Sequence, residues 1–73
     1  MFDYAKLKGK IKEKFNTQDN FAKAMGLSTV SMSNKLNNKI QWSQKEISKA
    51  CVFLEIEIID IPAYFFADKV KQP

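Results

Sequence analysis

The stretch from residue 17 to residue 37, TQDNFAKAMGLSTVSMSNKLN, constrains the fold more than any other part of this 73-residue chain. Thr17 is suited to cap a helix, because its hydroxyl can accept a hydrogen bond from an unpaired backbone N–H in the first turn. The apolar residues that follow have the spacing of one buried helical face: Phe21, Ala22 and Met25. The pattern therefore predicts a helix over residues 18–25.

A turn and a second helix follow directly. Gly26 can end the first helix, since glycine adopts positive φ without a Cβ clash. Ser28 can cap the next helix, and Met32 and Leu36, four residues apart, give that helix one inward face. The sequence thus predicts a second helix over residues 29–36, joined to the first by a turn of three to four residues.

The rest of the chain predicts three more short helices and no sheet. The first, over residues 3–15, has a buried stripe of Tyr4, Leu7, Ile11 and Phe15. The next begins after Ser43, which forms a capping box with Glu46, and buries Ile47, Ala50, Cys51 and Leu54. The alternating stretch 55–61 has no partner strand, so it is interpreted as a loop that enters a last helix near Asp60 and Pro62. The expected fold is all-α with five short helices, as one domain over residues 1–66 and a flexible tail over residues 67–73.

The pattern resembles the helix-turn-helix of the Cro/CI (XRE-type) family of phage and bacterial regulators. The residues that carry the resemblance are Thr17, Gln18, Ala22, Gly26, Ser28, Met32 and Asn37. Asn38 stands where the family usually has glycine, and asparagine can also adopt the left-handed conformation that this turn needs. The opening MFDYAKLKGKIKEKF and the closing IPAYFF are similar to a small Cro-like phage subgroup. The resemblance implies a lambda-repressor-like helix-turn-helix DNA-binding domain.

Carried over residue by residue, the resemblance also implies a DNA-contacting surface. The start of the second helix would face base edges in the major groove, through Thr29, Val30, Ser31, Ser33 and Asn34. The rim of that surface would contact phosphates, through Gln18, Lys35, Asn38, Lys39, Ser43, Gln44 and Lys45. Relatives often have an apolar residue at the position of Lys35 and a polar one at Leu36. Lys35, one residue from the inward-facing Leu36, is expected to point outward, and the exchange predicts that the inward face of this helix is rotated slightly.

The charge distribution favours a nucleic-acid partner. Residues 1–50 hold ten lysines and four acidic residues, a net charge of +6, whereas residues 51–73 hold two lysines and four acidic residues, a net charge of −2. The chain has no arginine, the side chain that most often recognises guanine in the major groove. If the protein reads DNA, it does so without this residue.

The C-terminal segment is more apolar than the core of so small a domain requires. The residues expected at an interface are Ile58, Ile59, Tyr64 and Phe66. The alternative, that these side chains all cap the core, remains open. Symmetric binding to an operator requires two recognition helices about 34 Å apart, so a homodimer is one expectation and a heterodimer with a CI-type repressor is another.

Other classes of function are not expected. The chain has no histidine, no glycine-rich phosphate loop and a single cysteine, so neither an enzyme, a metal site nor a cofactor is predicted. No membrane span, signal peptide or small-molecule substrate is expected, and the predicted location is the cytoplasm of a bacterial host.

Two functions therefore remain. The first is a Cro-like repressor that reads double-stranded operator DNA in the switch of a temperate phage or prophage. The second is an antirepressor, similar to the short modulators encoded beside CI repressors in some phages of lactic bacteria. Such a protein would bind the helix-turn-helix domain of its CI partner. The lysines favour the first function, whereas the missing arginine and the apolar C-terminal segment favour the second.

Overall fold

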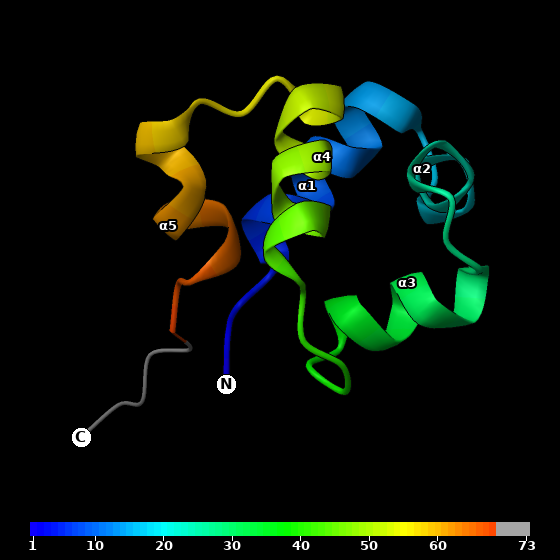
Figure 1. Cartoon of the computed structure of the whole chain (residues 1–73), viewed down its shortest axis with the longest axis horizontal. Helices are drawn as coiled ribbons and strands as arrows, with labels where there is room; N and C mark the ends of the chain where they lie inside the picture. The colour runs from blue at the N-terminus through cyan, green and yellow to red at the C-terminus, as the bar shows by residue number, and fades with distance from the viewer. Residues whose placement is uncertain (69–73) are drawn as a thin grey trace.

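The computed structural model describes residues 1–68, and over this range the chain folds into five short α-helices and one 3₁₀ turn (Figure 1). The elements in chain order are α1 (Ala5–Phe15), α2 (Gln18–Met25), α3 (Thr29–Leu36), α4 (Gln44–Leu54), η1 (Ile58–Asp60) and α5 (Ile61–Phe65). The predicted all-α class and the five helices are confirmed. No described helix is long and apolar enough to cross a membrane.

The ends of α2 and α3 follow from the capping residues. The Thr17 hydroxyl accepts a hydrogen bond from the backbone N–H of Asn20 at 3.1 Å, and Gly26 ends α2 at φ 75°. The Ser28 hydroxyl accepts from the backbone N–H of Ser31 at 3.0 Å and thereby starts α3. These contacts satisfy backbone groups that a helix terminus otherwise leaves unpaired.

The other helix boundaries are close to those expected. The carboxylate of Asp3 accepts a hydrogen bond from the backbone N–H of Ala5, so α1 begins two residues later than predicted. The predicted capping box of Ser43 and Glu46 is present at the start of α4. Glu55 ends α4 in the left-handed conformation, at φ 55°.

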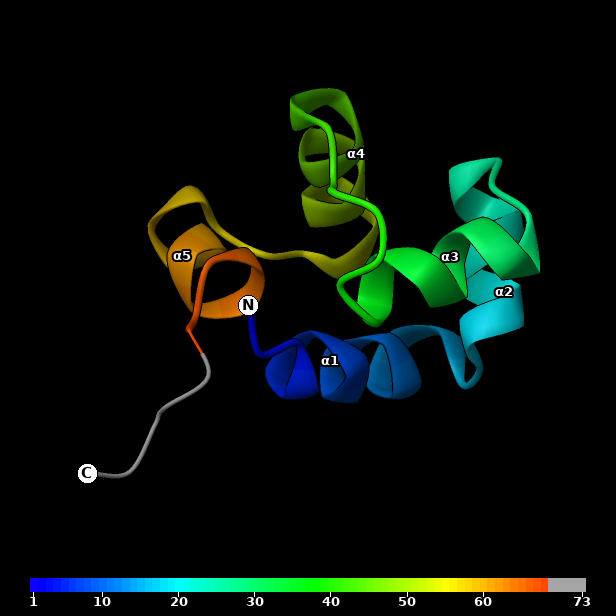
Figure 2. The ribbon, with the colours of Figure 1, turned by 90° about the horizontal axis from the view of Figure 1, so that it is seen from below.

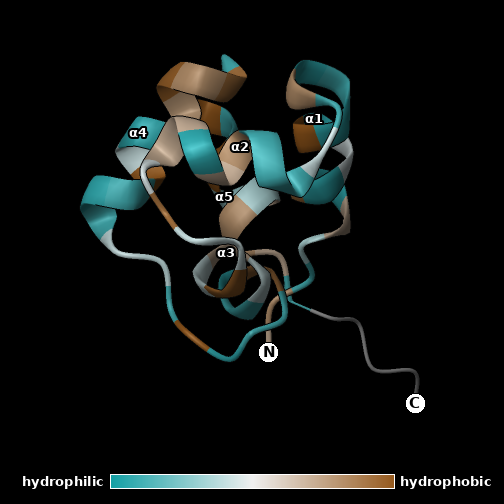
Figure 3. Ribbon diagram, turned by 90° about the vertical axis from the view of Figure 1, so that its right-hand side faces the viewer, coloured by the Kyte–Doolittle hydropathy of each residue, from teal (hydrophilic) through white to brown (hydrophobic). Residues whose placement is uncertain are grey.

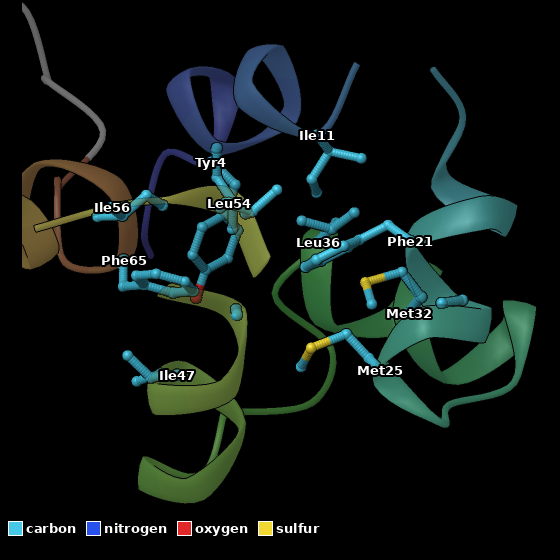
Figure 4. Close-up of a cluster of buried hydrophobic side chains, with 13 residues drawn as sticks. Tyr4, Ile11, Phe21, Met25, Met32, Leu36, Ile47, Leu54, Ile56 and Phe65 are labelled. Atoms are coloured by element: carbon cyan, nitrogen blue, oxygen red, sulfur yellow. The ribbon is translucent and has the colours of Figure 1, made fainter. Parts of the chain in front are cut away.

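The core lies between the helices and takes one apolar face from each (Figure 4). Its largest fully buried side chains are Phe21, Phe65, Leu7, Ile11, Met32 and Leu54. The expected stripe on α1 is buried at Tyr4, Leu7 and Ile11, and half-buried at Phe15. Ile56 and Phe65 close the core beside α1 and α4, so part of the apolar C-terminal segment does cap the core.

The segment from residue 55 to residue 60 forms no strand, as expected, and its last three residues are the 3₁₀ turn η1. Within residues 1–68 the chain has one isolated β-bridge, between Phe2 and Asp68. The Asp3 backbone N–H also donates to the Ala67 carbonyl at 2.6 Å. Backbone contacts thus place Ala67 and Asp68, the first two residues of the expected tail, against the N-terminal segment. The rest of that expected tail, residues 69–73, lies outside the described residues.

Asn38 ties the turn after α3 to the beginning of the chain. It adopts the left-handed conformation expected for this position, with φ 64°. Its side chain makes two hydrogen bonds with the backbone of Phe2: the amide donates to the carbonyl at 2.7 Å, and its oxygen accepts from the N–H at 3.0 Å. Residues 36 positions apart are thus held together by one side chain.

We expect Asn38→Gly to lower the melting temperature by roughly 5–10 °C, because it removes two partly buried hydrogen bonds worth about 1 kcal/mol each. Glycine keeps the left-handed backbone without strain. The matched control is Asn16→Gly, at another left-handed asparagine, whose side chain is exposed and makes no hydrogen bond within residues 1–68. Thermal unfolding followed by circular dichroism checks the difference. Equal melting temperatures for both variants would show that the tie to Phe2 contributes nothing.

The helices are arranged so that α3 and α5 lie on opposite sides of the molecule along its longest dimension (Figure 1). The view from below shows the same separation, with α5 to the left of α1 and the α2–α3 pair to the right (Figure 2). The N-terminal segment and the loop between α3 and α4 lie between these two ends. This arrangement brings the N-terminal segment and the loop after α3 together between α3 and α5.

Candidate functional site

The five residues expected to contact bases lie at the start and along the outer side of α3. Val30 is 68% exposed, and Thr29 is exposed but donates its hydroxyl hydrogen to the Asp19 carboxylate at 2.6 Å. Ser31, Ser33 and Asn34 are half-buried, and Ser33 accepts a hydrogen bond from the Asn37 amide at 3.2 Å. The exposed part of α3 therefore offers one apolar side chain and few polar groups that are not already engaged.

Lys35 is placed differently from the prediction. It was expected to point outward toward a phosphate, but it is only 6% exposed. Its ammonium group lies 2.9 Å from the Glu46 carboxylate and donates to the Gln41 carbonyl at 3.1 Å. Leu36 is buried as well, so both exchanged positions face inward. A buried lysine needs such partners, and the ion pair to α4 supplies them.

The N-terminus of α4, expected to be another phosphate site, already holds a carboxylate. Glu46 accepts hydrogen bonds from the Ser43 backbone N–H at 2.9 Å and from Lys35, and the Ser43 hydroxyl caps the helix. Burial raises the pKa of Glu46. The hydrogen bonds from Lys35 and Ser43 and the positive charge of Lys35 together lower it by more, so its pKa lies below the ordinary value. Glu46 therefore keeps its negative charge where a phosphate would have to approach.

The remaining residues of the expected phosphate-binding rim are of two kinds. Gln18, Lys39, Gln44 and Lys45 are exposed, and nothing within residues 1–68 engages the two lysines in an ion pair. The Asn38 side chain, in contrast, is committed to Phe2. About half of the side chains expected to contact phosphates are thus exposed and available to a ligand.

A hollow of about 490 Å³ opens beside α3, between the N-terminal segment, the loop after α3 and the end of α5. Its walls are mainly apolar and aromatic: Phe2, Tyr4, Ile40, Trp42, Phe65 and Phe66. The only polar side chains in the lining, apart from the Tyr4 hydroxyl and the Trp42 indole, are the uncharged Asn38 and Gln41. Met1, which carries the N-terminal ammonium group, and Ile47 complete the lining. A concave surface of this size, rich in aromatic side chains and with a few polar groups, is typical of a site that receives apolar groups.

Aromatic contacts define the shape of this hollow. The Trp42 ring packs edge-on against Phe65, with 5.3 Å between ring centres, and Phe2 packs edge-on against Phe66 at 5.6 Å. The Trp42 indole N–H is buried and has no acceptor among the described residues. Trp42 is thus part of the packing between the loop and α5.

The four residues expected at an interface do not form one surface. Ile58 and Ile59 are 85% and 82% exposed and project from η1. Phe66 is 49% exposed and lies at the wall of the hollow. Tyr64 is half-buried, and the Lys6 ammonium lies 4.9 Å from the centre of its ring. The structure therefore brings Phe66 to the hollow and leaves the two isoleucines at the other end of α5.

Four exposed apolar side chains within residues 1–68 were not identified from the sequence: Met1, Ile40, Val52 and Phe53. Ile40 lies in the loop after α3, and in Figure 3 this loop has a short hydrophobic stretch between hydrophilic ones. An isoleucine inside the polar run Asn37–Gln41 was the available signal, since the core has no evident need for an apolar residue there. The hollow itself depends on segments distant in sequence and had no local signal.

Comparisons with known proteins follow this geometry. The solution structure of the modulator of repression (MOR) of the temperate bacteriophage TP901-1 from Lactococcus lactis is similar to this one, with a TM-score of 0.82 and 54% sequence identity. The match covers 96% of this chain and 95% of that chain. No curated protein matches the sequence. A family model, described as a protein of unknown function (DUF739), matches residues 1–68. The chain therefore belongs to the DUF739 family.

Proposed function

We propose that this protein is an antirepressor of a temperate phage or prophage, which binds the helix-turn-helix domain of a CI-type repressor in the cytoplasm of the bacterial host. The observation that carries the proposal is the aromatic-lined hollow beside the loop that follows α3, whose lining includes Ile40 and Phe66. The 54% identity to a phage modulator of repression, over nearly the whole of both chains, supports the same function.

The surroundings of α3 suit a protein partner better than DNA. A Cro/CI-type protein that binds operator DNA would contact phosphates through cationic side chains and free hydrogen-bond donors around the recognition helix. Here Lys35 is buried in an ion pair, Asn38 is bonded to Phe2, and Glu46 occupies the start of α4. Phosphate oxygens would not be stabilised by a hollow lined mainly with aromatic side chains. Burial of an apolar side chain of a protein partner in the hollow is favourable, because it removes apolar surface from water.

The geometry also suggests how the partner is held. A protein interface is usually anchored by a few apolar or aromatic side chains that fill pockets on the other surface. The hollow would receive such an anchor from the repressor, and the exposed Val30 on α3 would extend the contact. Binding to the repressor's helix-turn-helix domain would then block its operator contacts, with no cofactor.

A Cro-like, operator-reading function is the second candidate, and a specific observation favours it. Five exposed lysines have no ion pair or aromatic partner within residues 1–68: Lys8, Lys12, Lys23, Lys39 and Lys45. Together with the α2–α3 pair, which resembles the Cro/CI helix-turn-helix, they would give salt-dependent attraction to DNA. Sequence recognition would then fall to Thr29, Val30 and Asn34.

Fluorescence anisotropy with labelled operator DNA separates the two functions. In the first arm the full-length CI-type repressor of the same phage is bound to the DNA, and this protein is added. In the second arm this protein alone is added to operator and to scrambled DNA at two salt concentrations. We expect release of the repressor in the first arm and weak, sequence-independent binding in the second. A specificity ratio above about 10³ for the protein alone, with no release of the repressor, would establish the Cro-like function instead.

A further inference from the structure

The turn η1 presents the most exposed pair of apolar side chains within residues 1–68. Ile58 and Ile59 are 85% and 82% exposed, and no core contact explains either of them. Two exposed acidic residues flank the pair, Glu57 before it and Asp60 after it. Neither acidic residue forms an ion pair with any other described residue. We call Glu57, Ile58, Ile59 and Asp60 the acidic isoleucine turn.

This turn is close to the wall of the hollow. The five-residue helix α5 joins them, with η1 at its start and Phe66 directly after its end. Five helical residues span roughly 7.5 Å, so one partner can cover the turn and the hollow together. A stable protein interface usually buries roughly 800 Å² per partner, so we expect the contact to extend beyond the hollow. A contact that crosses α5 would supply more of that area.

The charges indicate what kind of surface covers the turn. A second copy of this chain, related by a two-fold axis through the isoleucines, would bring Glu57 and Asp60 against the same carboxylates, which is unfavourable. DNA would be repelled for the same reason. A protein surface with an apolar depression bordered by lysine or arginine would complement both the isoleucines and the carboxylates.

We propose that the acidic isoleucine turn is a second part of the repressor-binding surface, and that it covers basic side chains with which the repressor's DNA-binding domain holds phosphates. This inference rests on the proposed function, since a DNA-binding domain must carry such cations. The hollow anchors the repressor, and the carboxylates of the turn pair with the basic side chains with which the repressor binds phosphates. Displacement from the operator is then direct competition between the carboxylates of this protein and the phosphates of DNA.

The test is the affinity of full-length repressor for variants of the whole chain, by isothermal titration calorimetry at two salt concentrations. The double variant Glu57→Gln/Asp60→Asn should bind roughly tenfold more weakly at low salt and show less salt dependence. Ile59→Ser should weaken binding by a similar factor with little change in salt dependence. The controls are Glu13→Gln, on α1, and Val52→Ser, an exposed apolar residue on α4; both should bind like the wild-type protein.

Other outcomes overturn the inference in distinguishable ways. If the wild-type protein binds the repressor and the turn variants bind equally well, the turn is not part of the interface, while the proposed function stands. If the wild-type protein neither binds nor displaces the repressor, the proposed function fails and the inference fails with it. If sedimentation shows a dimer that the turn variants dissociate, a second copy covers the turn and the proposal is wrong. The double variant is nearly isosteric and lies on an exposed turn, so an unchanged helical spectrum is expected throughout.

Discussion

Replacing Ile40 by aspartate is expected to weaken binding to the repressor at least about 100-fold while the fold remains intact. Ile40 lines the hollow and is 44% exposed. A carboxylate there would be desolvated by the incoming side chain, and the only charged group among the described lining residues is the exposed N-terminal ammonium of Met1. An uncompensated buried charge costs several kcal/mol, enough for a loss of this size. The fold should tolerate the change, because the hydrogen bond of Ile40 to the Asn34 carbonyl uses only its backbone N–H.

The matched control is Val52→Asp. Val52 is also an exposed apolar residue, at 76%, but it lies on α4 and does not line the hollow. Titration of repressor into each variant measures the affinity, and circular dichroism reports the helix content. Binding of Ile40→Asp at the affinity of Val52→Asp would show that the partner docks elsewhere. Loss of helix in Ile40→Asp alone would assign Ile40 to the core.

The helices could be predicted because their signals are local. Thr17, Ser28 and Ser43 cap helices in the structure as their side chains predict, and Gly26 adopts the positive φ that ends α2. The inward stripes follow the helical period, so most core residues on α1, α2 and α4 were identified from spacing alone, while Phe15 and Cys51 are only half-buried. Each of these features involves residues within one or two helical turns of each other.

The interactions that engage Lys35 and Asn38 are not local. Glu46 was assigned to the capping box, yet the same carboxylate also pairs with Lys35, eleven positions earlier, and this pairing turns the lysine inward. The left-handed backbone of Asn38 was predictable, but its bonds to Phe2, 36 positions away, were not. A resemblance in motif therefore could not show which polar groups around α3 the chain itself engages.

The hollow could not be predicted from the sequence for the same reason. Its walls come from the first four residues, the loop after α3, α4 and the end of α5, and it forms only when these segments pack. The sequence did indicate surplus apolar residues near the C-terminus, of which Phe66 lines the hollow and Ile58 and Ile59 remain exposed. Composition thus indicated surplus apolar residues, whereas their positions on the surface required the tertiary structure.

The second large effect concerns the buried ion pair between α3 and α4. Lys35→Ala should lower the free energy of unfolding by about 3 kcal/mol and the melting temperature by roughly 10–20 °C. The change leaves the Glu46 carboxylate with less compensation, leaves the Gln41 carbonyl without its donor, and opens a cavity beside Trp42. Lys35→Met should cost less, since methionine fills the space that alanine leaves empty, but it removes the same contacts to Glu46 and to the Gln41 carbonyl. A loss in Lys35→Met as large as that in Lys35→Ala would mean that the charge, and not the packing, matters most.

The pH dependence of stability separates these contributions. The pKa of Glu46 is lowered in the folded protein, so its contribution is complete above the ordinary value of 4.5 and is lost as the pH falls through the lower folded value. Lys35→Met removes the hydrogen bond and the charge that lower this pKa, and it leaves the burial that raises it. The stability difference between wild-type protein and Lys35→Met, measured by urea unfolding, should therefore be larger at pH 7 than at pH 3. An equal difference at both pH values would show that the ion pair does not stabilise the fold through the charge of Glu46.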